Sequence, residues 1–227
     1  MSDALALASA AATAGTTTLV ATPHIDHQWH VRPELIPRLA AALRAEMRNE
    51  GIELELRTSG EVALSRLADL TNEQKRALRL GDGPYLLLES PLTPLAGDFD
   101  LLLGTVLRRG ESVVLAHPER SPLFQQEPER LLRLVDAGLL CSISTGSLRG
   151  DFGELVRRFT IELLREGVAH DLSSDAHDSL QRPPGLADAL SRVEHELPGI
   201  SAQGEWLTEL APAAILAGEP LPSRPGN

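Results

Sequence analysis

Short apolar runs alternate along this chain with longer stretches that have the apolar repeat of amphipathic helices. The short runs are rich in Leu and β-branched residues, as strands are. This alternation predicts an α/β fold in which helices surround a parallel sheet. The predicted strands cover residues 17–22, 52–59, 85–90, 112–117, 139–144 and 168–174.

Several of the helical stretches have recognisable ends. Pro33 and Pro128 stand near two helix starts, and Gly110, Gly138 and Gly167 stand just past three helix ends. No linker, low-complexity tract or repeat interrupts the pattern, so we expect one domain over residues 1–220 and a frayed tail at 221–227. The predicted helices cover residues 3–14, 33–50, 98–109, 128–137, 153–166, 185–197 and 205–217.

Charge and cysteine content narrow the classes of function. A formal net charge of -11 argues against a nucleic-acid partner, which would need a basic face. The single cysteine, Cys141, excludes an internal disulfide and fits a reducing compartment. No apolar run is long enough to insert into a membrane, and Asp3 stands where a secretory signal would be positively charged. We therefore expect a cytoplasmic protein.

Polar side chains recur at the carboxyl ends of the predicted strands. In parallel α/β folds these ends form the functional face, so we expect the side chains to share one mouth. Any one of them alone is more commonly a capping or solvent-facing residue, whereas a set at one end of one sheet favours a common site. The set consists of His24, Glu61, Glu89, His117, Asp175 and His177.

This set offers three imidazoles and three carboxylates, and no thiolate. Such nitrogen and oxygen ligands suit manganese, iron or zinc better than calcium. Six ligands exceed what one ion needs when water must also bind, so we expect two or more ions bridged by a carboxylate such as Glu89. The positive charge of such a cluster would attract an anionic substrate.

Two arginines stand close behind the last histidines of the set. Arg120 follows His117 by three residues and Arg182 follows His177 by five, so both should reach the rim of the mouth. Guanidinium groups hold phosphate oxygens through paired hydrogen bonds, and the alternative role is a surface ion pair. Metals together with arginines favour hydrolysis of a phosphate ester, with a metal-activated hydroxide attacking phosphorus in line.

Other polar residues stand next to members of the set. Asp26, His27 and His30 follow His24 and would either extend the site or line its entrance. Glu119 is expected to point away from the mouth and pair with a helix, because successive residues cannot all face one way.

For three further side chains we predict structural roles and no part in the site. Cys141 is separated from Arg149 by seven residues, whereas a cysteine-phosphatase loop has five, so we expect Cys141 to be a buried apolar residue. His170 lies within a predicted strand and is expected in the core. His195 is expected on an exposed helix face.

The motifs that carry these residues together resemble one family, the metal-dependent protein-tyrosine phosphatases of the polymerase-and-histidinol-phosphatase (PHP) superfamily. Members of this type accompany bacterial capsule and exopolysaccharide synthesis. The resemblance runs in order over nearly the whole chain. The motifs are ATPH (21–24), GEV (60–62), LLLES (86–90), AHPER (116–120), TGSLRGDFG (145–153), SDAH followed by RPP (174–184), and LAPAAILAG (210–218).

The resemblance implies a distorted (β/α)7 barrel of the PHP type with a trinuclear site, usually supported by manganese, so two or three ions are expected. By motif, the six predicted ligands match metal ligands, and Arg120 and Arg182 match phosphate-holding arginines. The implied substrate is a phosphotyrosine protein, a bacterial tyrosine kinase. The tyrosine hydroxyl has a pKa of about 10, so it can leave without a general acid, and the sequence offers no obvious one.

The resemblance breaks at the start of the chain. Family members begin with a strand ending in Asp-x-His-x-His, whose histidines are ligands, whereas Met1 falls where the following helix is under way. The six predicted strands are likewise one fewer than the barrel needs, so we expect its first strand to be missing from this chain. A late start, a partner chain that supplies the edge, and a degenerate scaffold without catalysis stay open. So do a small-molecule phosphatase acting on a histidinol-phosphate-like substrate, and a homo-oligomer.

Overall fold

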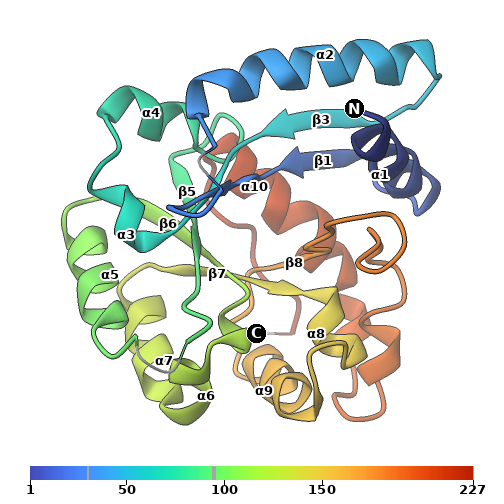
Figure 1. Cartoon of the computed structure of the whole chain (residues 1–227). Coiled ribbons are helices and arrows are strands. Elements are labelled where there is room, and N and C mark those ends of the chain that lie inside the picture. Colours follow the sequence, from blue (N-terminus) through green and yellow to red (C-terminus); the bar gives the residue numbers. More distant parts are fainter. Residues whose placement is uncertain (30, 94–95, 227) are drawn as a thin grey trace.

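The structure is a computed structural model, and it describes residues 1–29, 31–93 and 96–226. Parallel strands form the centre of the molecule and helices surround them (Figure 1). Each of the six predicted strand ranges contains an observed strand. The strands are β1 (Thr18–Ala21), β2 (His24–Ile25), β3 (Glu55–Thr58), β4 (Glu61–Val62), β5 (Tyr85–Glu89), β6 (Ser112–Ala116), β7 (Leu140–Ser144) and β8 (Asp171–Ser173).

Within each sheet the strands stand in the order in which they follow along the chain. One sheet has the order β2-β4-β5-β6-β7-β8, β1 pairs with β3, and every pairing between these strands is parallel. Just past each of the first two predicted ranges the chain forms a second short strand, β2 after β1 and β4 after β3. Pro23 separates β1 from β2, because proline has no N–H to donate to a ladder. The parallel α/β class predicted from the sequence is therefore confirmed.

The pairing register brings predicted site residues of neighbouring strands close to one another. His24 stands opposite Glu61 in the β2–β4 pair. Glu89 stands opposite Ala116, the residue before His117, in the β5–β6 pair. Side chains that are far apart in the sequence thus emerge at the same edge of the sheet.

Helices cover six of the seven predicted ranges. The α-helices are α1 (Ser2–Thr13), α2 (Ile36–Asn49), α3 (Leu64–Leu67), α4 (Asn72–Ala77), α5 (Phe99–Arg108), α6 (Pro122–Gln126), α7 (Pro128–Asp136), α8 (Thr145–Arg149), α9 (Glu154–Arg165) and α10 (Ala211–Ala217). Short 3-10 helices are η1 (Pro33–Leu35), η2 (Pro118–Arg120), η3 (Ser191–Val193) and η4 (Ile200–Gln203), and η5 (Trp206–Leu210) is a π-helix.

The helix predicted over residues 185–197 is wrong. This range forms turns and the single 3-10 helix η3. Its apolar residues Ala189, Leu190 and Val193 are nevertheless buried in a core cluster with Trp206. Tertiary packing buries the apolar side chains here without a continuous helix, so their spacing misled the prediction.

The core lies on both sides of the strands, as β6 illustrates. Val113 and Leu115 point outward and join Leu131 of α7 in one buried cluster. Val114 points inward and packs with Ile215 of α10. In Figure 1, α10 accordingly crosses behind β5 and β6. It thus covers part of the inner side of the sheet.

The expected tail is anchored at several points in the structure. The indole Nε1 of Trp206 donates to the carbonyl oxygen of Pro222 at 2.9 Å. Arg224 donates to the carbonyl oxygens of Gly167 and Ala169 at 2.8 and 2.9 Å. Among the described residues, no helix has both the length and the apolar character needed to cross a membrane.

Candidate active site

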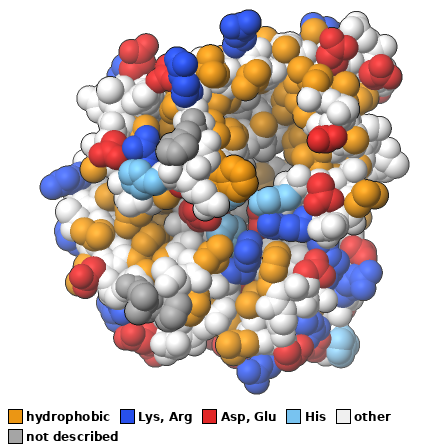
Figure 2. Space-filling view, in the orientation of Figure 1, with side chains coloured by type: hydrophobic (Ala, Val, Ile, Leu, Met, Phe, Trp, Pro, Cys, Tyr) orange, Lys and Arg blue, Asp and Glu red, His pale blue; other side chains and the backbone are white. Residues whose placement is uncertain are grey.

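A cavity of about 130 Å³ opens at the carboxyl end of the sheet. Figure 2 shows histidine, basic and acidic side chains gathered around a hollow on this face. Seven of the eight residues predicted for the site line the cavity, and the eighth, Glu61, contacts two of them. The lining residues are His24, Glu89, Leu92, His117, Arg120, Asp175, His177 and Arg182.

The Glu61 carboxylate lies between two imidazoles. Its Oε1 is 2.9 Å from His117 Nε2, and its Oε2 is 3.3 Å from His24 Nδ1. Glu61 begins β4, His24 begins β2 and His117 directly follows β6, so three parallel strands bring this group together. Both Glu61 and His117 are buried.

This group also includes Glu89 at the end of β5. Donor atoms of His24, Glu61 and Glu89 all lie within 4.8 Å of one another, which is close enough for one ion to contact all three. In addition, His117 Nδ1 is buried without a hydrogen-bond partner among the described residues. Buried polar atoms are rarely left unpaired. The nitrogen and oxygen donors and this orphaned nitrogen fit a divalent metal ion.

The carboxylates and imidazoles shift one another's proton affinities. Burial alone would raise the pKa of Glu61, but the hydrogen bond from His117 and the nearby imidazoles hold it below its ordinary value. Burial alone would lower the pKa of His117, but the hydrogen bond and the charge of Glu61 outweigh burial and raise it. Burial and the negative charge of Glu61 raise the pKa of Glu89. A cation at this point would relieve the repulsion between the two glutamates.

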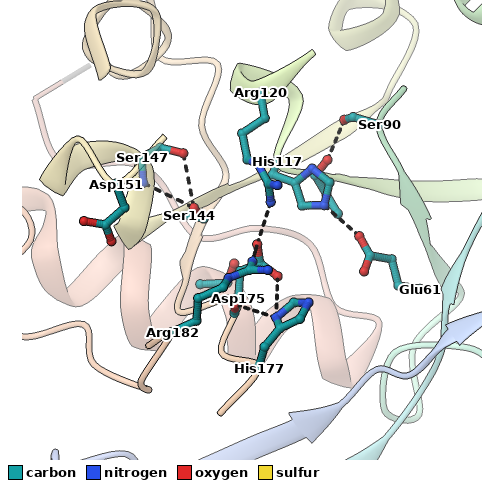
Figure 3. A network of polar contacts seen from close by, with 12 residues as sticks. Glu61, Ser90, His117, Arg120, Ser144, Ser147, Asp151, Asp175, His177 and Arg182 are labelled. Atoms are coloured by element: carbon teal, nitrogen blue, oxygen red, sulfur yellow. Dashed lines mark hydrogen bonds and ion pairs between the residues drawn. The ribbon is translucent and has the colours of Figure 1, made fainter. Parts of the chain in front are cut away.

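Asp175 joins the two arginines on the opposite side of the cavity (Figure 3). Its Oδ2 accepts hydrogen bonds from Arg120 Nη1 at 3.0 Å and from Arg182 Nη2 at 2.5 Å. His177 Nδ1 lies 3.0 Å from the carbonyl oxygen of Asp175. The structure thus places Asp175 and His177 at the cavity, with Asp175 bound to the arginines.

Two residues of the site have a strained backbone. His117 has φ 38° and Asp175 has φ 48°, and they are the only non-glycine residues with positive φ in the described part of the chain. This conformation typically costs about 1–3 kcal/mol and is common at functional sites. At each position the chain turns sharply where a strand has ended, and the turn directs the side chain into the cavity.

Glu119 lies directly behind the site and is fully buried. Its Oε1 accepts from the backbone N–H of Ser144 at 2.9 Å and from the Ser147 hydroxyl at 2.6 Å, both at the start of α8. Burial raises the pKa of this carboxyl. The prediction that Glu119 turns away from the mouth and pairs with a helix is confirmed.

The burial predicted for Cys141 and the packing role predicted for His170 are also confirmed, whereas His195 is exposed as predicted but lies in a turn and not on a helix. Cys141 is buried, and burial raises the pKa of its thiol, so it is no nucleophile. His170 Nδ1 accepts from the Cys141 N–H at 3.1 Å, and burial lowers its pKa to about 4. The His195 side chain is 77% exposed.

The described residues of the loop after β2 do not line the cavity. Asp26 Oδ1 accepts from the backbone N–H groups of Gln28 and Trp29, both at 2.8 Å, and so holds the loop in a turn. His27 is exposed and does not line the cavity. His30 lies outside the described residues. A role of these residues at the entrance stays a prediction.

Sequence reasoning missed two residues at the cavity. Leu92 lines it, and the ring of Phe152 lies against the guanidinium groups of both Arg120 and Arg182. Phe152 stands within the motif TGSLRGDFG, but its sequence neighbours give no sign that it contacts Arg120 and Arg182, which are 32 and 30 residues away. Only the folded chain reveals this contact.

A larger hollow, of about 470 Å³, lies along β3 and the end of α2. It contains no histidine and none of the residues predicted for the site. Two of its arginines are already bound, Arg44 to the carbonyl oxygen of Leu56 and Arg57 to Glu55. The smaller cavity, and not this hollow, therefore has the chemistry of an active site.

Comparisons with known proteins agree with this geometry. The family model "Capsular polysaccharide synthesis, CpsB/CapC" matches residues 1–205. The tyrosine-protein phosphatase YwqE of Bacillus subtilis (strain 168) is 29% identical over 195 residues, covering 86% of this chain and 77% of that protein. The putative tyrosine-protein phosphatase CapC of Staphylococcus aureus is 27% identical over 186 residues, covering 81% and 72%.

The fold has a solved counterpart as well. It comes from crystal structures of YwqE from Bacillus subtilis and CpsB from Streptococcus pneumoniae, which are described as metal-dependent tyrosine phosphatases. The TM-score is 0.83 at 27% sequence identity, over 99% of this chain and 90% of the other.

Proposed function

The chain belongs to the CpsB/CapC family of capsular polysaccharide synthesis, and from this premise we propose that it is a metal-dependent protein-tyrosine phosphatase. The observation that carries the proposal is a single cavity in which nitrogen and oxygen donors face two arginines. Neither a small-molecule phosphatase nor a scaffold without catalysis is favoured, because the matched relatives are named as tyrosine phosphatases.

The residues proposed to hold metal are His24, Glu61, Glu89, His117, Asp175 and His177, as in the sequence prediction. We propose manganese as the metal and two or three ions as their number. Bound divalent ions would supply a Lewis acid that polarises the phosphoryl group and lowers the pKa of water. Glu61 supports this role because it orients the imidazoles of His24 and His117 by direct contact.

Arg120 and Arg182 are proposed to bind the oxygens of the substrate's phosphate. Asp175 Oδ2 occupies one nitrogen of each guanidinium, and each has further N–H donors available. Preorganised cations of this kind stabilise the charge that develops on the phosphoryl oxygens in the transition state. A tyrosine leaving group suits the site because its pKa of about 10 removes the need for a general acid.

The substrate proposed for the site is a phosphotyrosine protein, and specifically a bacterial tyrosine kinase of polysaccharide synthesis. The matched family is one of capsular polysaccharide synthesis, which supports this choice. A cytoplasmic location belongs to the same proposal, supported by the free thiol of Cys141. Residues 1–220 are proposed to fold as one domain.

We further propose that the sheet belongs to the seven-stranded barrel of the PHP type. Support comes from the six parallel strands β2-β4-β5-β6-β7-β8, which stand side by side in chain order. The Asp-x-His-x-His pattern of the family's first strand does not occur within residues 1–227. The reading frame upstream of Met1 tests this point, since an in-frame Asp-x-His-x-His there would place the strand in the same gene.

The proposed activity is tested with matched phosphorylated substrates. The purified protein, supplied with manganese, is assayed on a phosphotyrosine peptide, on the same peptide with phosphoserine, and on histidinol phosphate. We expect release of phosphate from the phosphotyrosine peptide in preference to the other two. Preferential turnover of histidinol phosphate would establish the small-molecule alternative, and no turnover of any substrate would support the scaffold.

A further inference from the structure

The ring of Phe152 contacts both arginines of the cavity. The guanidinium carbon of Arg120 lies 4.1 Å from the ring centroid, and that of Arg182 lies 5.6 Å from it. Both distances fall within the range of about 6 Å in which a cation is attracted to the face of an aromatic ring. Arg120 ends η2 after β6, whereas Arg182 follows β8, so Phe152 links two separate loops.

The two arginines need such a partner because they carry like charges in a small space. Both donate to the same oxygen of Asp175 (Figure 3), and this single carboxylate can offset only one of the two positive charges. Asp175 is also one of the residues proposed to hold metal, so its negative charge would be shared between the arginines and a metal ion. The π-face of Phe152 attracts both guanidinium groups. Unlike Asp175, Phe152 is not among the residues proposed to hold metal, so this attraction is not shared with a metal ion.

Three glycines, Gly146, Gly150 and Gly153, allow the loop that carries Phe152 to place the ring at this position. Gly150 and Gly153 flank Asp151 and Phe152, and both have left-handed backbones, with φ 87° and 93°. The Asp151 N–H donates to the carbonyl oxygen of Gly146 at 3.0 Å, and a Cβ at Gly146 would lie 3.0 Å from Phe152 Cε2. The absence of a side chain at position 146 therefore makes room for the ring.

We propose that Phe152 is a positioning residue that holds the guanidinium groups of Arg120 and Arg182 in the geometry that binds the substrate's phosphate. This inference rests on the proposed function of the two arginines. Loss of the ring should weaken the binding of phosphate in the substrate and as a free ion. It should leave the group of His24, Glu61 and Glu89 in place, because neither cation–π contact involves these residues.

The test compares substitutions that keep or remove the ring. Phe152→Leu is expected to raise both the KM for the phosphotyrosine peptide and the inhibition constant of inorganic phosphate by about 5- to 30-fold, the loss of two cation–π contacts. The value of kcat should change less, and the manganese concentration for half-maximal activity should stay unchanged. Phe152→Tyr, which keeps the ring, should restore wild-type values. Phe99→Leu is the matched control, since Phe99 packs on Phe124 away from the cavity.

Two outcomes would overturn the proposal. One is an unchanged KM and phosphate inhibition constant in Phe152→Leu while the wild type is active. The other is a double variant, Phe152→Leu with Arg120→Lys, whose effects on KM are the product of the single effects. If circular dichroism shows that Phe152→Leu does not fold, Phe152→Met is measured in its place. The expected changes in KM and in the phosphate inhibition constant are the same.

The failure of the proposed function is distinguishable from the failure of this inference. A wild-type protein that hydrolyses no phosphotyrosine refutes the function. Calorimetric titration of inorganic phosphate into the metal-free wild type and Phe152→Leu proteins then still tests the positioning role. Equal phosphate affinity in these two proteins would refute that role, and a 5- to 30-fold weaker affinity in the variant would support it.

Discussion

The imidazole ring of His24 lies 5.9 Å from that of His177, with an angle of 56° between their planes. The two residues belong to opposite edges of one sheet, because His24 begins the outermost strand β2 and His177 follows the outermost strand β8. Among the described residues β2 and β8 are not paired. The sheet therefore curves until its two edges meet at their carboxyl ends, and this curvature encloses the cavity.

Glu61→Gln should remove the central anion of the cavity with little change in shape. Glu61 contacts both His24 and His117, and a neutral amide can no longer neutralise a bound cation. We expect the affinity for manganese to fall by at least about tenfold, as even indirect ligand contacts have effects of this size. Isothermal titration calorimetry measures the affinity, and activity against manganese concentration checks it.

Glu127→Gln is the control for this substitution, since the Glu127 side chain is 58% exposed and pairs with Arg130 at the surface. It should bind manganese as the wild type does. Equal affinity in the Glu61 and Glu127 variants would show that Glu61 does not hold the metal.

Arg182→Lys should keep the positive charge and lose the planar guanidinium group with its several N–H donors. A lysine cannot donate to Asp175 and to a phosphate in the geometry that a guanidinium allows. The loss of one charge-assisted hydrogen bond of about 1.5–3 kcal/mol corresponds to a fall in kcat/KM of roughly 10- to 150-fold. Steady-state kinetics on the phosphotyrosine peptide measures it. Arg192→Lys, in an exposed ion pair with Asp188, is the matched control, and a comparable fall there would point to a general effect of the substitution.

Removal of metal should lower the stability of the fold as well as its activity. A ligand present at about 100 times its dissociation constant stabilises by about 2.7 kcal/mol, which corresponds to a rise in Tm of about 5–10 °C for a chain of this size. Scanning fluorimetry with a chelator and with manganese measures this shift. It should shrink in His177→Ala and persist in His195→Ala, whose side chain is exposed. An equal shift in both variants would argue against His177 as a ligand.

The sequence predicted the parts of the site that depend on local order along the chain. His24, Glu61, Glu89 and His117 each stand at or next to a strand that its apolar residues reveal, and a parallel sheet places such residues at one edge. No knowledge of side-chain contacts was needed for this step. The convergence of these four residues therefore follows from the order of the strands in the sheet.

The remaining features depend on contacts between distant segments. That both arginines bind one oxygen of Asp175, and that Phe152 lies against them, follows from how three loops meet. The short helix α8 was not predicted, because five residues are too few to show a helical repeat. The first turn of this helix is held by hydrogen bonds to the buried carboxylate of Glu119, which is distant in the sequence. Such features have no signature within a window of the sequence.

Asp171→Asn should stabilise the protein by an amount that grows as the pH rises from about 4 to 7. Burial, with a smaller contribution from the charge of Glu119, raises the pKa of Asp171 to about 7, although the Ser142 hydroxyl donates to it at 2.6 Å. Between about pH 4 and 7 the folded protein then holds a proton on Asp171 that the unfolded chain has released. The free energy of unfolding therefore decreases with rising pH in this window, and an asparagine, which does not titrate, escapes the decrease.

The neighbouring His170 acts in the opposite direction. Its pKa of about 4 lies below the usual value of a histidine, so the unfolded chain binds the proton first and stability decreases as the pH falls below about 6.5. In the wild type the two contributions offset each other, whereas Asp171→Asn leaves only that of His170. We expect this variant to gain on the order of 2 kcal/mol over the wild type at pH 7 and little at pH 4. Urea unfolding at both pH values measures the gain, with Asp82→Asn, whose side chain is 90% exposed, as the control. A gain that is equal at the two pH values would mean that the pKa of Asp171 is not raised in the folded protein above its value in the unfolded chain.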